Sequence, residues 1–470
     1  MNSCKISLSA GIGDCIQVLS FLYPIQSFYN QNKDFKVYLT YGRINDCGHL
    51  TIIQDFCSRL PYTEWVEKEN FDSVNASELT WNRPISKELG DFVATHKPTQ
   101  LEFSLREDEQ ALFKQEFFKK PYIFIQLSSN SPQRIWDRNN YVTLIKEILF
   151  KSDYNIVLND WKGAKELDIT DNRIQSIIGS DIAFAAHIVR NAALIISTCS
   201  WNKYVASLGS VPRIILCADV TEMLGLKDQL EMLNNVFGLV ISYPNYNLLG
   251  VFNYRIENNK FIQGEIIEHV NKITVSDVFR AFFLEDFKIR YKDKLCKRFN
   301  TFYKAFEMLS EKNNYSYRIV ETGCIREENN WVGDGCSTFL FDNFAQKFNC
   351  EVISVDNDKT HCELAKKLTK NVNAYCEDSV KLLYNLYEIK NGIDLLYLDS
   401  RDLCEKNPHP SALHHLNELA VSLKNLKKGS LVLTDDNISK ECQKGLYCRE
   451  LLENIGAKII LDEYQTLWQI

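Results

Sequence analysis

Short apolar runs typical of β-strands alternate with amphipathic stretches typical of helices along most of the chain. The first cycle begins with a strand at 5–9 and a helix, followed by a second strand at 35–42. The pattern restarts with a strand near residue 120 and again with a strand at 317–323. Because parallel strands need crossover connections, usually helical, this alternation predicts an α/β fold built from parallel sheets.

The stretch from about 285 to 316 differs, because it is charged, has helical periodicity and contains no strand pattern. It predicts a helical connector or the first helix of a following domain. At roughly 150 residues per domain, the 470 residues suggest about three domains. We therefore expect Rossmann-like domains at 1–118, 119–285 and 317–470, with 286–316 as the helical connector.

Composition and charge narrow the function classes. The chain is 45% hydrophobic and 24% charged, which is typical of a globular protein and not of a disordered one. Lys and Arg number 54 against 61 Asp and Glu, giving a net charge of −7. No global positive field attracts nucleic acid, so we expect no nucleic-acid partner. The pattern indicates no particular oligomeric state.

The 15 cysteines show no zinc-ligand spacing, since no CxxC pair occurs anywhere in the chain. The opening residues lack the apolar core of a signal peptide, and no run approaches the roughly 20 apolar residues that span a bilayer. We expect free thiols, no transmembrane segment and a cytoplasmic location.

The first strand is followed by the turn G-I-G-D and a helix. Gly11 and Gly13 permit a tight turn and the close approach of a ligand to the helix N-terminus. Asp14 at this place could act as a general base on a hydroxyl. Asp is also a preferred helix N-cap, so the spacing by itself leaves both roles open.

A second polar loop, LSSNSPQRIW at 127–136, follows the strand YIFIQ. Hydroxyl and amide donors in a strand-to-loop turn, together with an arginine, can bind phosphate oxygens. The candidates are Ser128, Ser129, Asn130 and Arg134. An ordinary polar loop is the alternative, and Trp136 is expected to pack beneath it.

In this order, G-I-G-D, LSSNSPQRIW and the segment ending SLGSVP resemble the heptosyltransferase-like glycosyltransferases of family nine, which have the GT-B fold. The resemblance covers roughly 5–285 and implies inverting transfer from a nucleotide sugar to a glycan acceptor. It makes Asp14 the base. The residues implied to bind the nucleotide sugar are Gly13, Ser128, Ser129, Asn130, Arg134 and Lys203. The chain departs from the family at Thr198, where an acid is usual, and Lys203 could instead be solvated.

The last third of the chain contains a second kind of ligand-binding pattern. The strand RIVETG ends in Gly323, the run G-D-G-C-S-T with Gly335 precedes a helix, and the next strand ends at Asp356. A Gly-rich turn with an acid at the end of the next strand is how Rossmann-like folds hold a ribose. The turn lacks the G-x-G-x-x-G of a pyrophosphate site, which favours S-adenosylmethionine over a dinucleotide.

The series ETG, GDGCST, VISVDND, CEDSV, DLLYLDS and LVLTDDN resembles the class I S-adenosylmethionine-dependent methyltransferases over about 316–470. The residues that the resemblance assigns to the cofactor are Glu321, Gly323, Gly335, Asp356, Asp378, Ser379 and Asp399. Within this set Asp356 would bind the ribose and Asp378 would lie beside the adenine. A helix N-cap is the alternative for Asp378.

Three acids, one of them Asp399, follow strands that end on the same sheet edge. Asp399 closes LLYLD, and Asp435 with Asp436 closes LVLTDD. Converging carboxylates repel each other unless a cation lies between them, which predicts Mg²⁺. The trio resembles the metal site of catechol-type and macrocin-type O-methyltransferases, whose base corresponds here to Asp402.

Three histidines nearby, His409, His414 and His415, are alternatives for the base, although the HHL sequence is more typical of a solvated helix start. The sequence therefore predicts a bifunctional enzyme that transfers a sugar and O-methylates a sugar hydroxyl. Two alternatives remain: an active methyltransferase with a degenerate, glycan-binding GT-B module, and a scaffold without turnover.

Overall fold

The computed structural model describes most of the 470-residue chain. The described residues are 3–8, 19, 36–41, 49–60, 63–71, 77–80, 101–129, 134–198, 200–209, 211–217, 246–250, 255–257, 260–262, 270–312, 316–333, 336–386 and 392–470. The chain divides into two compact units, Met1–Phe282 and Phe283–Ile470. Of the predicted domain borders, the one at 118 lies inside the first unit and the one at 285 lies close to the division.

The first unit contains a four-stranded parallel sheet in the order β3-β2-β1-β4. Its strands are β1 (Ser3–Leu8), β2 (Lys36–Tyr41), β3 (Thr63–Trp65) and β4 (Ser77–Thr80). Helices α3 (His49–Ser58) and α4 (Lys68–Phe71) lie between them in sequence. Alternate residues of the strands, such as Ile6 and Leu8, are fully buried, as the period of two in a strand requires.

A second parallel sheet of the first unit has six strands in the order β10-β9-β8-β5-β6-β7. They are β5 (Tyr122–Gln126), β6 (Asn155–Asn159), β7 (Ile174–Ser176), β8 (Leu194–Thr198), β9 (Arg213–Cys217) and β10 (Tyr246–Gly250). The helices around it are α6 (Glu107–Phe113), α7 (Glu116–Lys119), α8 (Arg138–Lys151), α9 (Ile182–Arg190) and α10 (Asn202–Leu208). A hairpin of β11 (Arg255–Glu257) and β12 (Lys260–Ile262) follows.

Both faces of this six-stranded sheet are covered. Phe124 and Val157 belong to a core that includes the apolar side of α9, whereas Ile123 and Ile156 belong to a core with α8. Neighbouring residues of one strand thus enter different cores, which explains why the strands are continuously apolar. In chain order the strands run 3-2-1-4-5-6, the order of a dinucleotide-binding Rossmann sheet.

The charged stretch before residue 316 is helical, as predicted. It consists of α13 (Val275–Leu295), a 3₁₀ turn η3 (Cys296–Arg298) and α14 (Phe299–Glu311), preceded by the turn η2 (Val270–Lys272). The side chains of α14 are part of a buried core, where Phe302 lies 5.5 Å from Tyr397, centroid to centroid. Of the two predicted roles, α14 therefore takes that of the first helix of the following domain.

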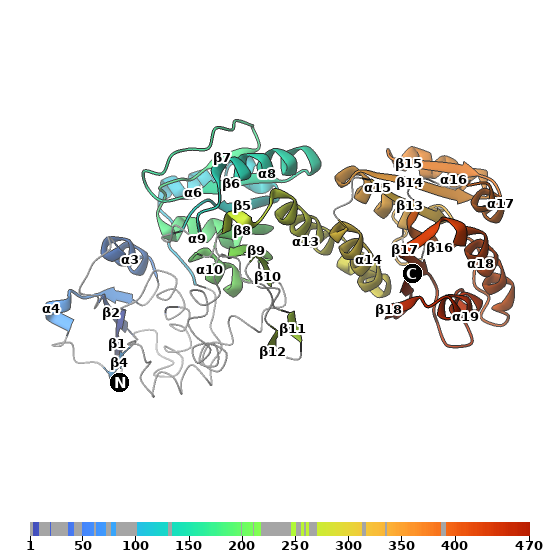
Figure 1. Ribbon diagram of the computed structural model, residues 1–470. Coiled ribbons are helices and arrows are strands. Elements are labelled where there is room, and N and C mark those ends of the chain that lie inside the picture. The colour runs from blue at the N-terminus through green and yellow to red at the C-terminus, as the bar shows by residue number, and fades with distance from the viewer. Residues whose placement is uncertain are drawn as a thin grey trace. The chain divides into compact units, whose positions relative to one another are not determined.

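The second unit is built on a seven-stranded sheet in the order β15-β14-β13-β16-β17-β19-β18, and Figure 1 labels its strands β13 to β17. The strands are β13 (Tyr317–Thr322), β14 (Cys350–Asp356), β15 (Val372–Cys376), β16 (Ile393–Leu398), β17 (Leu426–Thr434), β18 (Lys458–Asp462) and β19 (Thr466–Gln469). The first five are parallel, and β19 is antiparallel to both β17 and β18. The helices are α15 (Ser337–Lys347), α16 (Lys359–Leu368), α17 (Ser379–Asn385), α18 (His409–Ser422) with the turn η4 (Leu423–Asn425), and α19 (Leu446–Asn454).

Helices cover both faces of this sheet as well. Leu395 and Leu431 pack with α14 and α15 on one side, and Leu396 and Val432 pack with α18 and α19 on the other. The fold class predicted from the sequence is confirmed as α/β: two parallel sheets lie in the first unit, and a third sheet, whose first five strands are parallel, lies in the second. Within the described residues, no helix is both long and apolar enough to cross a membrane.

Candidate functional site

The strand order of the second unit reverses between β13 and β16, and open α/β sheets bind ligands at the carboxyl edge of such a reversal. Gly323 directly follows β13 with φ +91°. A Cβ atom at Gly323 would lie 2.8 Å from the backbone oxygen of Asp399, which directly follows β16. Only glycine both adopts this conformation and permits this close approach of the two strand ends.

Glu321, near the end of β13, is fully buried. Its two carboxylate oxygens accept hydrogen bonds from the hydroxyls of Ser337 at 2.5 Å and Ser354 at 2.6 Å. Burial raises the pKa of the Glu321 carboxyl to about 7, although these hydrogen bonds oppose the effect. Glu321 therefore ties β13 to α15 and β14 beneath the site, and its predicted contact with a cofactor stays a prediction.

Asp356 ends β14 and lies beside the Gly323 turn. One of its oxygens accepts from the backbone N–H of Cys324 at 3.0 Å, and the other accepts from the N–H of Asp358 at 2.8 Å. His361 Nδ1 lies 3.2 Å from the first of these oxygens. The loop after β13 and the start of α16 thus hold the carboxylate in one orientation at the sheet edge. Gly335 lies outside the described residues.

Asp378 and Ser379 begin α17. Asp378 is the N-cap, accepting from the N–H of Lys381 at 2.8 Å, which is the structural alternative raised by the sequence. The Ser379 hydroxyl donates to Glu418, which is fully buried and also accepts from Ser400 at 2.6 Å. The hydroxyl of Ser379 is thus used within the protein.

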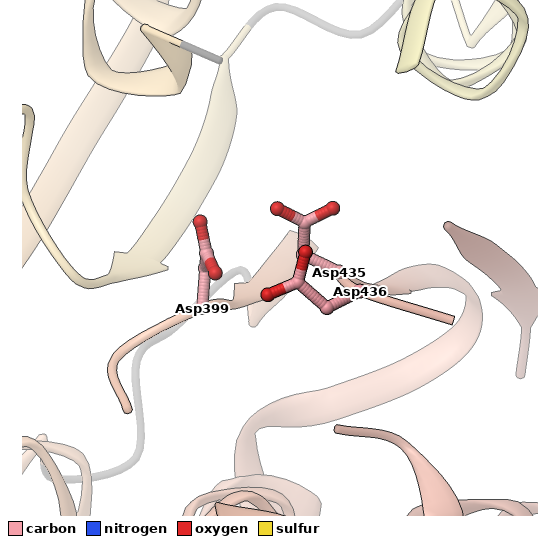
Figure 2. Close-up of side chains that lie close together, drawn as sticks. All are labelled: Asp399, Asp435 and Asp436. Atoms are coloured by element: carbon pink, nitrogen blue, oxygen red, sulfur yellow. The ribbon is translucent and has the colours of Figure 1, made fainter. Parts of the chain in front are cut away.

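The three acids predicted to converge do so (Figure 2). One carboxylate oxygen from each of Asp399, Asp435 and Asp436 lies within 4.8 Å of the others. Two consecutive residues of an extended strand would point to opposite faces. β17 ends at Thr434, however, and Asp436 has φ +49°, a left-handed conformation that breaks this alternation. The turn brings both neighbouring carboxylates to one edge.

All six oxygens of this acid triad, Asp399, Asp435 and Asp436, have donors within the protein. Lys444 Nζ contacts Asp399 Oδ1 and lies 3.0 Å from Asp436 Oδ2. Arg298 Nε contacts both oxygens of Asp435, at 3.2 and 3.0 Å. The remaining two oxygens accept from the tyrosine hydroxyls of Tyr397, at 3.2 Å, and Tyr464, at 2.6 Å.

Burial raises the pKa of the Asp399 carboxyl to about 8, against the opposing effect of Lys444. By their chemistry, carboxylate oxygens are suitable ligands for Mg²⁺. Two buried cations already face the three acids, so the net charge of the site is −1 when all three carboxylates are ionised and zero when Asp399 holds its proton. The three carboxylates, already paired with these two cations, therefore do not fit a divalent ion. The magnesium predicted from the sequence stays a prediction.

The candidate bases differ in their surroundings. Asp402 is largely exposed, and its carboxylate accepts from Arg326 at 2.8 Å. His409 Nδ1 lies 2.7 Å from the Tyr447 hydroxyl, and both residues line a surface pocket of about 520 Å³ together with Arg401 and His414. His415 is fully buried, and burial lowers its pKa to about 4, so the expectation that both histidines of HHL are solvated is wrong.

In the first unit, the strand order reverses between β5 and β8. Ser128, just beyond β5, donates to Asp160, just beyond β6, and Arg138 lies 3.3 Å from the same carboxylate. Ser129 is buried and Arg134 is half-buried. Asp14, Gly13 and Asn130 lie outside the described residues.

The neighbouring strand end of β8 carries buried polar atoms. Asn202 is fully buried, and its Oδ1 accepts from Ser197 at 2.8 Å. Its Nδ2 and the Thr198 Oγ1 have no hydrogen-bond partner among the described residues. Lys203 is buried too, so the alternative that it is solvated is wrong. Trp136 is fully buried in the core with α8, and its Nε1–H donates to the backbone oxygen of Ile273 at 2.9 Å.

Several residues of these sites escaped the sequence reasoning. Asp160 closes the strand NIVLN, so the rule used for Asp356 could have identified it. Lys444 lies in a polar loop and Arg298 in a charged helical stretch, where single cations are ordinary. Nothing in the local pattern distinguishes either of them.

No protein-family model and no curated protein matches the chain. Solved structures do resemble it. E. coli ADP-heptose lipopolysaccharide heptosyltransferase II matches 61% of this chain and 98% of its own, at 12% identity and a TM-score of 0.41. A glycosyltransferase of family 9 from Veillonella parvula matches 60% of this chain and 97% of its own, at 13% identity and a TM-score of 0.36.

The MycE methyltransferase of mycinamycin biosynthesis, solved with Mg, S-adenosylhomocysteine and mycinamycin VI, matches 40% of this chain at 15% identity and a TM-score of 0.28. This match spans 54% of the MycE chain. Similarities at these identities concern the fold alone.

Proposed function

We propose that the chain is a bifunctional carbohydrate-modifying enzyme that transfers a sugar from a nucleotide sugar and O-methylates a sugar hydroxyl with S-adenosylmethionine. The observation that carries the proposal is the position of the Asp356 carboxylate. Two backbone N–H groups hold it at the carboxyl edge of the seven-stranded sheet of the second unit, beside Gly323 with its left-handed backbone conformation. An acid in this place is suited to accept hydrogen bonds from the two hydroxyls of a ribose.

The methyl-transfer step needs positioning more than covalent help from the protein. The acceptor hydroxyl oxygen attacks the sulfonium methyl, a C–O bond forms, and the C–S pair stays on sulfur as the thioether leaves. The hydroxyl proton passes to a base, for which Asp402 is proposed, with His409 and His414 as alternatives. No step of this proposal passes through a metal.

Calorimetry of the full chain with S-adenosylmethionine tests this half of the proposal. Asp356→Asn should weaken binding at least tenfold, because one of two ribose acceptors becomes a donor. Asp358→Asn is the matched control, since Asp358 caps α16 two residues away and Asn is an equally good cap. Absence of S-adenosylmethionine binding by the wild type would exclude the methyltransferase function.

The glycosyltransferase half rests on the polar groups at the β5 and β8 ends. A nucleoside diphosphate gains negative charge as the glycosidic bond breaks, and Arg134 with Lys203 is proposed to balance it. The acceptor hydroxyl attacks the anomeric carbon and loses its proton to Asp14. Release of nucleoside diphosphate from a panel of nucleotide sugars, with wild type and Asp14→Asn compared, tests this assignment. Unchanged turnover in the variant would remove Asp14 as the base.

A second candidate is an active methyltransferase with a degenerate, glycan-binding GT-B module. Thr198 favours it, because this residue stands where an acid is usual and is fully buried at the end of β8. The donor panel decides between the two, since a degenerate module releases no nucleoside diphosphate. A cytoplasmic location belongs to the same proposal, because both co-substrates are made there.

A further inference from the structure

Lys444 bridges Asp399 and Asp436 of the acid triad, whereas Arg298 lies between Asp435 and Asp436. Lys444 lies in the loop between β17 and α19 and is almost fully buried. Its ammonium contacts Asp399 and lies 3.0 Å from Asp436, so it stands between the ends of β16 and β17. A divalent ion coordinated by both acids would need this same place.

The loop that carries Lys444 is held close to β17. The Lys444 N–H donates to the backbone oxygen of Asp436 at 3.4 Å, and Gln443 pairs with Asn437 in an isolated bridge. A Cβ at Gly445 would lie 2.8 Å from Thr434 Oγ1, so glycine is what allows the loop to approach the strand. Because the backbone of residues 443–445 is held against the end of β17, the Lys444 ammonium is kept in the site by the fold.

Charge makes the lysine and a divalent ion alternatives. With all three acids ionised the triad carries three negative charges, and Lys444 with Arg298 balances two of them, so at most one is left. Arg298 is occupied with Asp435 and also donates to the oxygen of Val332 at 2.9 Å. Two cations a few ångströms apart in a site of low dielectric repel each other strongly. A divalent ion would therefore have to expel a buried ammonium and leave it unpaired, which is costly.

We propose that the Lys444 ammonium takes the place of a divalent cation, so that this site works without a metal and the acceptor hydroxyls donate directly to the partly exposed carboxylates of Asp399 and Asp436. The catalytic part of this inference rests on the proposed methyltransferase function. The cation part does not, because metal binding is measurable whether or not the chain transfers methyl groups. Lys444 is a positioning residue that holds the two acids together.

Calorimetric titration of the full chain with Mn²⁺ tests the proposal. We expect Lys444→Met to bind Mn²⁺ at least tenfold more tightly than the wild type, because the variant uncovers a site with one more net negative charge and vacant space. Lys444→Arg keeps the charge and should behave like the wild type. Lys347→Met is the matched control, since Lys347 is another buried lysine in an ion pair, with Asp286. Adding Asp436→Asn to Lys444→Met should abolish the gain.

Stoichiometric binding of micromolar Mn²⁺ by the wild type overturns the proposal, and so does a folded Lys444→Met protein that gains no affinity. Folding is checked by near-ultraviolet circular dichroism, and if Lys444→Met does not fold, the wild-type titration decides by itself. Titration of the same samples with S-adenosylmethionine keeps the two questions separate. Loss of S-adenosylmethionine binding contradicts the proposed function, whereas the Mn²⁺ pattern alone decides about Lys444. If the chain is a methyltransferase and Lys444 takes the place of the metal, methyl transfer continues undiminished in EDTA.

Discussion

Replacing Glu321 by glutamine should remove a pH dependence from the stability of the second unit. Glu321 is fully buried between β13, α15 and β14, and it accepts hydrogen bonds from two serine hydroxyls. Burial nevertheless raises its pKa from the ordinary 4.5 to about 7 in the folded protein. The folded state therefore holds this proton over a pH range in which the unfolded chain has already lost it.

The sign and size follow from linkage between proton binding and folding. Where the folded state binds more protons than the unfolded one, stability falls as pH rises, so the loss begins near pH 4.5 and is complete above pH 7. At about 1.4 kcal/mol for each unit of pKa, the whole effect is about 3 kcal/mol. Between pH 5 and pH 8 the wild type should lose about 2.5 kcal/mol through this group.

Native-state hydrogen exchange of the β13 and β14 amides measures the free energy of opening in the full chain, without requiring that both units unfold together. After correction for intrinsic exchange rates, the wild type should lose about 2.5 kcal/mol more than Glu321→Gln between pH 5 and pH 8. Glu351→Gln is the matched control, because Glu351 lies on the same strand pair but is partly exposed beside Arg318.

The control variant should keep the wild-type dependence on pH. Equal slopes for the wild type and Glu321→Gln would refute the reasoning, since they would mean that the buried carboxyl is ionised over the whole range. A steeper slope in the variant would have the wrong sign and would refute it as well.

Two further predictions concern the same sheet edge. Gly323→Ala should destabilise the second unit by about 2 kcal/mol more than Gly456→Ala. Both glycines have positive φ, but of the two only Gly323 is placed so that an added Cβ would meet backbone atoms. Hydrogen exchange of the β13 amides measures the difference, and equal effects would contradict the steric argument. Arg298→Met should lower the free energy of unfolding of the second unit by about 3 to 5 kcal/mol, because it leaves the buried Asp435 unpaired. Adding Asp435→Asn should restore about 2 kcal/mol or more of this stability. A double-mutant cycle on the β17 amides checks this, and strictly additive costs would show that the pair is not coupled.

The strand ends were predictable for a local reason. A buried parallel strand is a continuous apolar run, so the first acid after it marks the carboxyl edge, as Asp356 and Asp399 show. The convergence of Asp399 with Asp435 and Asp436 follows from the same rule once the two strands are neighbours. The alternative roles of Asp378 could not be separated from the sequence, because a helix N-cap and a ligand contact use the same residue at the same place.

The partners of these acids were not predictable. Arg298 and Asp435 are 137 positions apart in the chain, and Lys444 and Asp399 are 45 apart. Local patterns of polarity carry no information about which distant cation folds against which acid. The burial of His415 was not predicted for a similar reason, since the polar sequence around it does not show that this side of α18 faces the core.

By itself the sequence determined the alternation of strands and helices, the three sheets and the acids at their carboxyl edges, because period and turn chemistry are properties of neighbouring residues. Only the tertiary structure decided what balances those acids. The sequence predicted a magnesium ion, because three carboxylates need positive charge. The folded chain places Lys444 and Arg298 among them, since charge is balanced by whatever lies within a few ångströms in space and not by what is near in sequence.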